Sequence, residues 1–180
     1  MEVSPSSAGT LRALRRLVRA LRLADRAAEA RLGLSAAQLF VLERLAEGPV
    51  GSMAELAGRT LTDASSVSVV VQRLTERGLV LRATATDDAR RTTLRLSAAG
   101  RRLLQGAPRS PQADLIAAIE QLAAGERKEL ERLLERVVRG MGIDEAAPTP
   151  MFFEGESRDG RIRRRRPGPG PDPARSRRRG

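Results

Sequence analysis

Apolar residues recur at helical spacing over most of the chain, in segments that glycine, proline and helix-capping residues separate. The first segment predicts a helix over about residues 10–31 that ends near Gly33. Two serines, each followed three residues later by Gln or Glu, predict helices that begin after Ser35 and Ser52. A further helix is expected to follow, with Thr62 as its cap.

The pattern then changes from helical to strand-like spacing. Residues 79–84 and 92–96 are short runs rich in Leu, Val and Thr, and we expect them to pair as a hairpin with a polar, basic tip. Helical spacing returns after Ser97 and continues over about residues 112–141. This order predicts a mainly α fold with a small β-wing (α+β), a winged helix-turn-helix over about residues 35–97 between N- and C-terminal helices.

The helix after Thr62 has two different faces. Its buried stripe is predicted to consist of Val67, Val70, Val71 and Leu74, which recur at i, i+3, i+4 and i+7. Short polar side chains and longer hydrogen-bond donors are predicted to make the other face: Ser65, Ser66, Ser68, Val69, Gln72 and Arg73. A face of this kind suits the major groove of DNA. There Gln72 can pair with adenine, Arg73 can contact guanine or phosphate, and Val69 can touch a thymine methyl group.

Composition narrows the possible chemistry. The chain has no Cys and no His, which excludes thiol redox sensing and imidazole chemistry. It also lacks a phosphate-cradling glycine loop and a nucleophile-elbow motif, so we expect neither an enzyme nor a bound cofactor or metal. The N-terminus does not resemble a signal peptide, and no apolar run is long enough to span a membrane, so the expected location is the cytoplasm at the nucleoid.

The net charge of +11 is concentrated at one end of the chain. Residues 158–180 hold ten arginines and two aspartates, so the rest of the chain is only mildly basic. We expect residues 144–180 to be a disordered basic tail and residues 1–9 to be a flexible N-terminus, leaving one domain over residues 10–143. The tail can add salt-sensitive contacts to phosphates, or it can be without consequence for binding.

The two ends of the expected domain carry apolar stripes that flank the DNA-binding unit. We expect them to form a dimer interface, with these residues in contact: Leu11, Leu14, Leu17, Val18, Leu21, Leu130, Leu133, Leu134 and Val137. Two-fold symmetry would place two recognition helices about one DNA turn, ~34 Å, apart, as a pseudo-palindromic operator requires. The alternative is a monomeric bundle in which the stripes pack within one chain.

Three short segments, in this order and spacing, resemble the MarR family of bacterial regulators. The first is the helix and following strand over residues 63–80, and the second is Asp88-Ala-Arg-Arg91. The third is Leu-Ser-Ala-Ala-Gly at residues 96–100. The resemblance covers about residues 10–141 and implies a homodimer with intertwined terminal helices. It also implies that an arginine of the wing, Arg90 or Arg91, enters the minor groove and that Asp88 orients an arginine.

The sequence therefore predicts a sequence-specific regulator of transcription that binds double-stranded DNA as a homodimer and acts as a repressor. Action as an activator is the alternative.

 A small-molecule effector can tune such a protein by favouring one spacing of its two DNA-binding lobes, although no residue in the sequence identifies the effector. The alternative function is a winged-helix module that binds DNA without sequence preference, or another protein, and has no effector.

Overall fold

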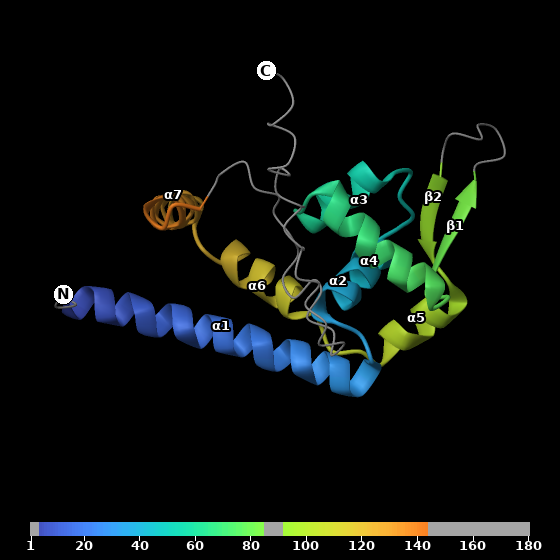
Figure 1. Ribbon diagram of the computed structural model, residues 1–180, viewed down its shortest axis with the longest axis horizontal. Coiled ribbons are helices and arrows are strands. Elements are labelled where there is room, and N and C mark those ends of the chain that lie inside the picture. The colour runs from blue at the N-terminus through green and yellow to red at the C-terminus, as the bar shows by residue number, and fades with distance from the viewer. Residues whose placement is uncertain (1–3, 85–91, 144–180) are drawn as a thin grey trace, which may run out of the picture.

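The computed structural model describes residues 4–84 and 92–143 of the 180-residue chain. Figure 1 shows a long N-terminal helix along one side of the molecule, with the remaining helices and one hairpin above it. The elements are α1 (Pro5–Leu32), α2 (Ala36–Ala46), α3 (Met53–Thr60), α4 (Ala64–Glu76), β1 (Val80–Thr84), β2 (Thr92–Leu96), α5 (Ala98–Gln105), α6 (Pro111–Glu120) and α7 (Ala124–Gly140). The mainly α fold with a small β-wing is confirmed.

Helix α1 begins earlier than the apolar pattern predicts. Ser4 caps it, because the backbone N–H of Ser7 donates to the Ser4 hydroxyl at 3.3 Å, and Pro5 occupies the first turn. The prediction of a flexible segment over residues 1–9 is therefore wrong for residues 5–9, which are helical without an apolar stripe of their own. The helix ends where predicted, at Gly33, which adopts the left-handed conformation with φ of +63°.

The core lies between α2, α3, α4 and the hairpin. Helix α4 presents its predicted apolar stripe to this core, and Phe40 and Leu42 of α2 meet it there with no exposed surface. Val50 forms an isolated β-bridge with β2. Its N–H donates to the Leu94 carbonyl at 3.0 Å, and the Leu94 N–H donates to the Val50 carbonyl at 2.8 Å. Burial of one face of α4 against three other elements fixes which face remains outside.

The hairpin follows directly from the end of α4. Gly78 has a φ of +67°, and the next N–H, that of Leu79, donates to the Leu74 carbonyl at 2.9 Å, so the chain reverses tightly. The two strands pair antiparallel from Val80 opposite Leu96 to the ends nearest the tip. Figure 1 shows the two strands side by side at one edge of the molecule, next to α5. The predicted β-wing is present, one residue shorter at its start.

Buried and half-buried hydrogen bonds tie the terminal helices to the core. Asp25 of α1 accepts a bond from the Ala36 N–H at 2.7 Å and so holds the start of α2. Glu43 of α2 accepts bonds from the N–H and hydroxyl of Ser110, at 2.7 and 2.5 Å, and so holds the start of α6. Gln112 of α6 also donates to a carbonyl at the end of α3 at 3.4 Å. Helices α1 and α6 are therefore joined to the same α2 helix by buried or half-buried polar contacts.

Helix α7 lies apart from the core in Figure 1 and has no buried residue. Its large apolar side chains are exposed, and Val137 retains 50% of its accessible surface. Several apolar residues of α1 are exposed in the same way: Leu11, Leu17, Val18 and Leu23. Within the part of the chain that the structure describes, no helix is long and apolar enough to cross a membrane.

One residue of the predicted dimer interface is placed differently. Leu21 is only 8% exposed and lies on the face of α1 that includes the buried Asp25 and Ala28. Its assignment to a dimer contact is therefore wrong, because its surface is already covered within its own chain. The other eight predicted residues are half-buried or exposed, so the single chain leaves them free to meet a partner.

Gly100 in α5 marks the closest approach between that helix and the hairpin. A Cβ atom at this position would lie 2.4 Å from the carbonyl oxygen of Leu79. We expect Gly100→Ala to destabilise the fold by about 1–3 kcal/mol, because the backbone must move to relieve the overlap. Urea unfolding followed by circular dichroism measures the change.

Gly58→Ala is the matched control for Gly100→Ala. Gly58 lies in α3, and nothing lies within 4 Å of a Cβ built on it. We expect the control to leave stability unchanged or to raise it by up to about 1 kcal/mol, since alanine favours helix more than glycine does. Equal destabilisation by the two variants would show that the contact between α5 and Leu79 is not the cause.

Candidate DNA-binding surface

Asp63 caps helix α4 and orders its first turn. Its carboxylate accepts bonds from the Ser66 N–H at 2.9 Å and the Ser66 hydroxyl at 2.8 Å, and from the Ser65 hydroxyl. Thr62 was the predicted cap. Instead, its hydroxyl lies 2.9 Å from that of Thr60, and Asp63 takes the capping position because its carboxylate reaches three donors. The prediction of the cap was wrong by one residue.

The same hydrogen bonds set the charge of this cap. Donation from the Ser65 hydroxyl, followed by donation from the backbone and side chain of Ser66, lowers the pKa of Asp63 from 3.8 to about 2. The carboxylate is therefore ionised at neutral pH and lies at the positive end of the α4 dipole, which it stabilises.

The outward face of α4 is largely as the helical pattern predicts. The exposed residues of this face are Ser65, Ser68, Val69, Gln72 and Arg73. They follow one another along the helix from its capped N-terminus to its last turn, on the side opposite the buried stripe. The arrangement offers hydroxyl groups first, then one aliphatic side chain, then an amide and a guanidinium.

Ser66 does not belong to this face. It is 9% exposed, and both its N–H and its hydroxyl are bonded to Asp63. The prediction that Ser66 contacts DNA is therefore corrected: its hydroxyl stabilises the start of α4. Helical spacing gives the direction of a side chain but not the demand for hydrogen bonds in the first turn, which a short serine close to an N-cap satisfies.

The amide of Gln72 is hydrogen-bonded within its own helix. Its Nε2 donates to Oε1 of Glu76, one turn further along α4, at 3.0 Å. Because an ionised carboxylate only accepts hydrogen bonds, the amide nitrogen must face Glu76, and the carbonyl oxygen of Gln72 must face away from it. A bidentate pairing with adenine uses the amide oxygen and the other N–H, so this orientation leaves both available.

Charged contacts tie helix α3 to the loop that precedes it. Arg59 donates to the carbonyl of Gly48 at 3.0 Å and pairs with Glu55 at 2.7 Å. Glu55 also accepts a bond from the Gly51 N–H at 2.8 Å, and this bond, followed by Arg59, lowers the pKa of Glu55. The predicted capping box of α3 is thus half-formed, because Ser52 caps the helix while the Glu55 side chain binds the residue before the cap.

The predicted residues of the wing tip, Asp88, Arg90 and Arg91, lie outside the described residues. The described parts of the two strands add Arg82 and Arg95, both exposed, which the sequence analysis did not select. Arg82 lies opposite the buried Leu94, on the same face of the hairpin, and is nevertheless exposed. The alternation Leu94-Arg95-Leu96 in β2 was the signal that could have identified Arg95, whereas Arg82 shares a face with buried residues and has no such signal.

Metal binding has no visible basis in the described ranges 4–84 and 92–143. They contain no cluster of three or more acidic side chains that could hold an ion. What these ranges do present is a helix with one buried and one polar face, followed by a hairpin with exposed arginines, and this is the geometry of a winged helix-turn-helix.

Comparison with known protein families agrees with this geometry. The model of the MarR family matches residues 32–91, which span the end of α1, helices α2 to α4 and the first strand of the wing. The match includes the capped helix, its polar face and the wing motif described above. The chain belongs to the MarR family. MarR proteins are transcriptional regulators with a DNA-binding winged helix, and this chain shares that fold and that class of function.

Solved structures of MarR-type proteins have the same architecture. Sco3205, a MarR family regulator from Streptomyces coelicolor solved in complex with DNA, is 23% identical over 78% of this chain and 90% of its own, with a TM-score of 0.52. A MepR-like protein solved with pseudoligands is 22% identical over 76% of this chain and 97% of its own, also with a TM-score of 0.52. At these identities the likeness concerns the fold.

A third solved structure is closer in sequence than these two. A probable transcriptional regulator from Pseudomonas aeruginosa is 32% identical over 69% of this chain and 92% of its own, with a TM-score of 0.45. No curated protein matches the chain.

The cap of α4 generates a testable prediction for this MarR protein. We expect Asp63→Ala to lower the Tm, because the first turn of α4 loses three hydrogen bonds. Asp63→Asn should have a Tm close to that of the wild type at neutral pH, since asparagine is an equally common N-cap. Differential scanning calorimetry of the two variants measures both changes.

The pH dependence of the same variants provides a second measurement. A carboxylate with a lowered pKa stabilises the folded state above its ordinary pKa, and this contribution disappears as the pH falls through its folded value. The difference in Tm between the wild type and Asp63→Asn should therefore become smaller as the pH falls from 3.8 to about 2. A constant difference across that range would contradict the assigned role of the carboxylate.

Proposed function

We propose that this MarR-family protein is a homodimeric repressor that binds specific sites in double-stranded DNA. The observation that carries the proposal is the division of α4 into a fully buried apolar stripe and an exposed polar face. The exposed face has the size and chemistry that fit a major groove, and the fold is that of a regulator solved in complex with DNA.

Each exposed residue of α4 has a role in this proposal. Ser65 and Ser68 contact the DNA first, since the N-terminal part of a recognition helix enters the groove most deeply. Val69 packs against a thymine methyl group, Gln72 pairs with adenine, and Arg73 contacts guanine or a phosphate. The hydrogen bond from the Gln72 amide nitrogen to Glu76 favours this assignment, because it turns the amide oxygen away from Glu76 and leaves the second N–H available.

The wing supplies the second set of contacts. By the resemblance to MarR proteins, Arg90 or Arg91 enters the minor groove, and Asp88 orients one of them. Arg82 and Arg95 are exposed on the strands that lead to this segment and can contact the phosphates on either side. Such contacts position the protein on DNA, whereas the α4 side chains provide its base preference.

The dimer is supported by surfaces that a single chain leaves uncovered. Helices α1 and α7 both expose large aliphatic side chains, and α7 has no residue buried in its own chain. Apolar surface of this extent on two helices marks a contact with another protein molecule. A two-fold pair would present two α4 helices to half-sites about one DNA turn apart.

Repression would follow when the dimer occupies its DNA site. A dimer seated on an operator excludes other proteins from the same DNA, which acts as repression and needs no catalytic step by the protein. A small-molecule effector would act by binding more tightly to one spacing of the two lobes than to another. The MepR-like protein was solved with pseudoligands, which makes such a partner reasonable for this chain as well.

Footprinting on the DNA upstream of the protein's own gene tests the proposal. We expect protection of a pseudo-palindromic site, and an affinity that exceeds that for a shuffled fragment by at least about 10³-fold at physiological salt. The same experiment with a chain that lacks residues 144–180 separates the basic tail from the domain. Uniform protection, or binding that vanishes without the tail, would favour non-specific DNA binding and contradict the repressor.

Two substitutions test the assigned contacts. Gln72→Ala should lower the discrimination at one base pair of the site by about 1–3 kcal/mol, because a bidentate contact is lost. Arg91→Ala should weaken DNA binding and reduce the salt slope by about 1, because one positive charge no longer displaces a counterion from the DNA. Binding measured against a library of single-base variants at several salt concentrations distinguishes the two effects.

Glu76→Ala is the companion of Gln72→Ala. It removes the carboxylate that orients the amide but leaves the amide itself in place. A smaller loss of preference at the same base pair is expected, and loss at a different base pair would show that Gln72 does not make the assigned contact.

A further inference from the structure

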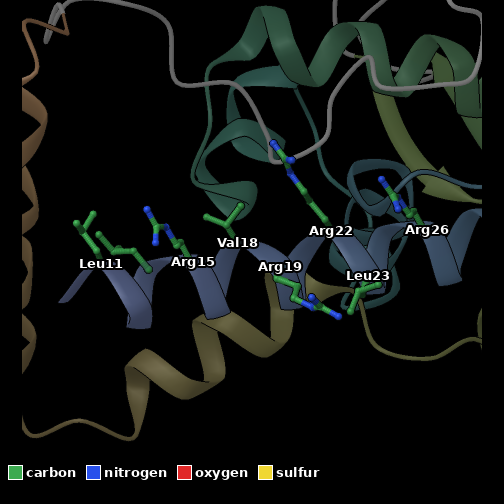
Figure 2. A pocket seen from close by; sticks show the side chains of 8 residues that line it. Leu11, Arg15, Val18, Arg19, Arg22, Leu23 and Arg26 are labelled. Carbon is green, nitrogen blue, oxygen red and sulfur yellow. The ribbon is translucent and has the colours of Figure 1, made fainter. Parts of the chain in front are cut away.

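Arginines cover the side of helix α1 that faces away from the core. Four of them lie within about 80° of one another around the helix, at 100° per residue, and form what we call the basic face of α1: Arg12, Arg16, Arg19 and Arg26. All four are exposed. Arg15 and Arg22 border this face, and Figure 2 shows them extending from the same side of α1 as Arg26. The one acidic residue between Arg12 and Arg26 is Asp25, which is buried on the other side of the helix.

The charge of the basic face is not compensated within its own chain. Across residues 4–84 and 92–143, none of its four arginines has a hydrogen bond or an ion pair. The arginines also repel one another, since Arg12 and Arg16 are four residues apart and Arg19 follows three residues later. Like charges at this spacing destabilise a helix, so a negatively charged partner bound here would stabilise it.

The chemistry of the basic face fits a row of phosphates. Its only large apolar side chain is that of Leu23, so it lacks the aliphatic surface by which a helix enters a membrane. From Arg12 to Arg26 it extends about 21 Å at a rise of 1.5 Å per residue, and over that length one strand of a DNA duplex presents about six phosphates. Each guanidinium can donate two parallel hydrogen bonds to the oxygens of one phosphate.

A duplex fits this face better than an acidic protein segment does. A flexible acidic peptide loses conformational entropy when its carboxylates are lined up along a helix. The phosphates of a duplex already have a fixed spacing, and their neutralisation releases condensed counterions, which favours binding further. The basic face therefore points to duplex DNA as its partner.

The basic face lies away from the surfaces assigned above. The aliphatic stripe of α1 is centred about 160° from it around the helix, so a second protomer bound at that stripe would leave the basic face open. Helix α1 packs mainly against α2 and α6. Figure 1 shows α1 along one edge of the molecule, with α3 and the hairpin at the opposite edge. DNA held by α4 and the wing would thus leave the basic face free for other DNA.

We propose that the basic face of α1 binds the phosphate backbone of a second DNA duplex, so that the protein bridges this duplex and the operator. The contact reads no bases, and its strength depends on salt. Bridging rests on the proposed binding of an operator by α4. The contact at α1 does not, because it forms with a duplex of any sequence.

A fourfold substitution of the basic face tests the inference in the full-length chain. The variant carries Arg12→Gln, Arg16→Gln, Arg19→Gln and Arg26→Gln, which remove the charges but keep a residue of similar helix propensity. The matched control removes four exposed charges outside the basic face, with Arg31→Gln, Arg102→Gln, Lys128→Gln and Arg136→Gln. A third chain with lysine at the four positions of the basic face keeps the charge and serves as the rescue.

Capture of a second duplex is the measurement. The fragment upstream of the protein's own gene is fixed to beads and loaded with protein, and a short fluorescent duplex of unrelated sequence is then added. We expect the wild type to capture it at 50 mM salt and to lose at least about 10²-fold in affinity for it at 200 mM, as four phosphate contacts require. The variant should capture at least about tenfold less, while the control and the lysine chain should stay within about threefold of the wild type.

Other outcomes overturn the inference. A variant that captures the second duplex like the wild type would place the bridging contact elsewhere, and equal losses in variant and control would reduce it to net charge. A variant that loses affinity for the upstream fragment itself, while the lysine chain retains it, would place the arginines at the operator. A wild type that captures poly-glutamate but no second duplex, and does so only with these four arginines, would make the partner an acidic protein.

Failure of the proposed function gives a different result. In that case the wild type does not prefer the upstream fragment to a shuffled one, whereas a duplex of any sequence still binds with an affinity that depends on the four arginines of α1. Preserved preference for the upstream fragment without capture of a second duplex contradicts only the bridging contact.

Discussion

The structure depends on the complete burial of one face of α4. Val67, Val70, Val71 and Leu74 are covered by α2, α3 and the hairpin, so the helix cannot rotate about its axis without exposing aliphatic surface. Transfer of one such side chain to water costs about 1.5–3 kcal/mol, and a rotation would expose several of them. The core therefore fixes the backbone of α4 and the direction in which each outward side chain leaves it. Side chains can distinguish one base from another only when they start from fixed backbone positions, and this core provides them.

The same rigidity extends from α4 to the helices that flank it, through polar contacts between distant parts of the chain. Arg77, just after α4, donates to the Gly33 carbonyl at 2.5 Å and so connects the recognition helix to the end of α1. Asp25 and Glu43 connect α1 and α6 to α2 in a similar way. Each protomer thus holds α4 at a defined angle to α1, and the distance between two α4 helices in a dimer would then follow from how the terminal helices meet. An effector that altered this meeting would alter the spacing without entering the DNA-binding surface.

Much of this architecture was predictable because it depends on local pattern. The stripe of α4, the left-handed turn at Gly78 and the two strands follow from the spacing of apolar residues and from turn chemistry. The wrong predictions concern residues whose exposure is set by a tertiary contact or a hydrogen bond. Leu21 belongs to the apolar stripe of α1, but only the packing of α1 on its own chain shows that it is covered. Ser66 is polar and lies next to the outward residues of α4, but its hydroxyl donates to the capping carboxylate of Asp63 and is therefore not available to DNA. The bond between Glu43 and Ser110 joins residues 67 positions apart and has no signal in a single sequence.

In the proposed dimer, the aliphatic character of the chain leaves the alignment of the two copies to charge. With only three Phe residues and no Trp or Tyr, both exposed stripes consist of Leu and Val, which pack adequately in more than one alignment. Aliphatic surfaces supply association, but they discriminate poorly between alignments one turn apart, and flanking charges are the usual means of excluding the wrong ones. Alignment matters here more than affinity does, because a shift by one helical turn moves the chain by about 5.4 Å and would displace the second α4 from its half-site.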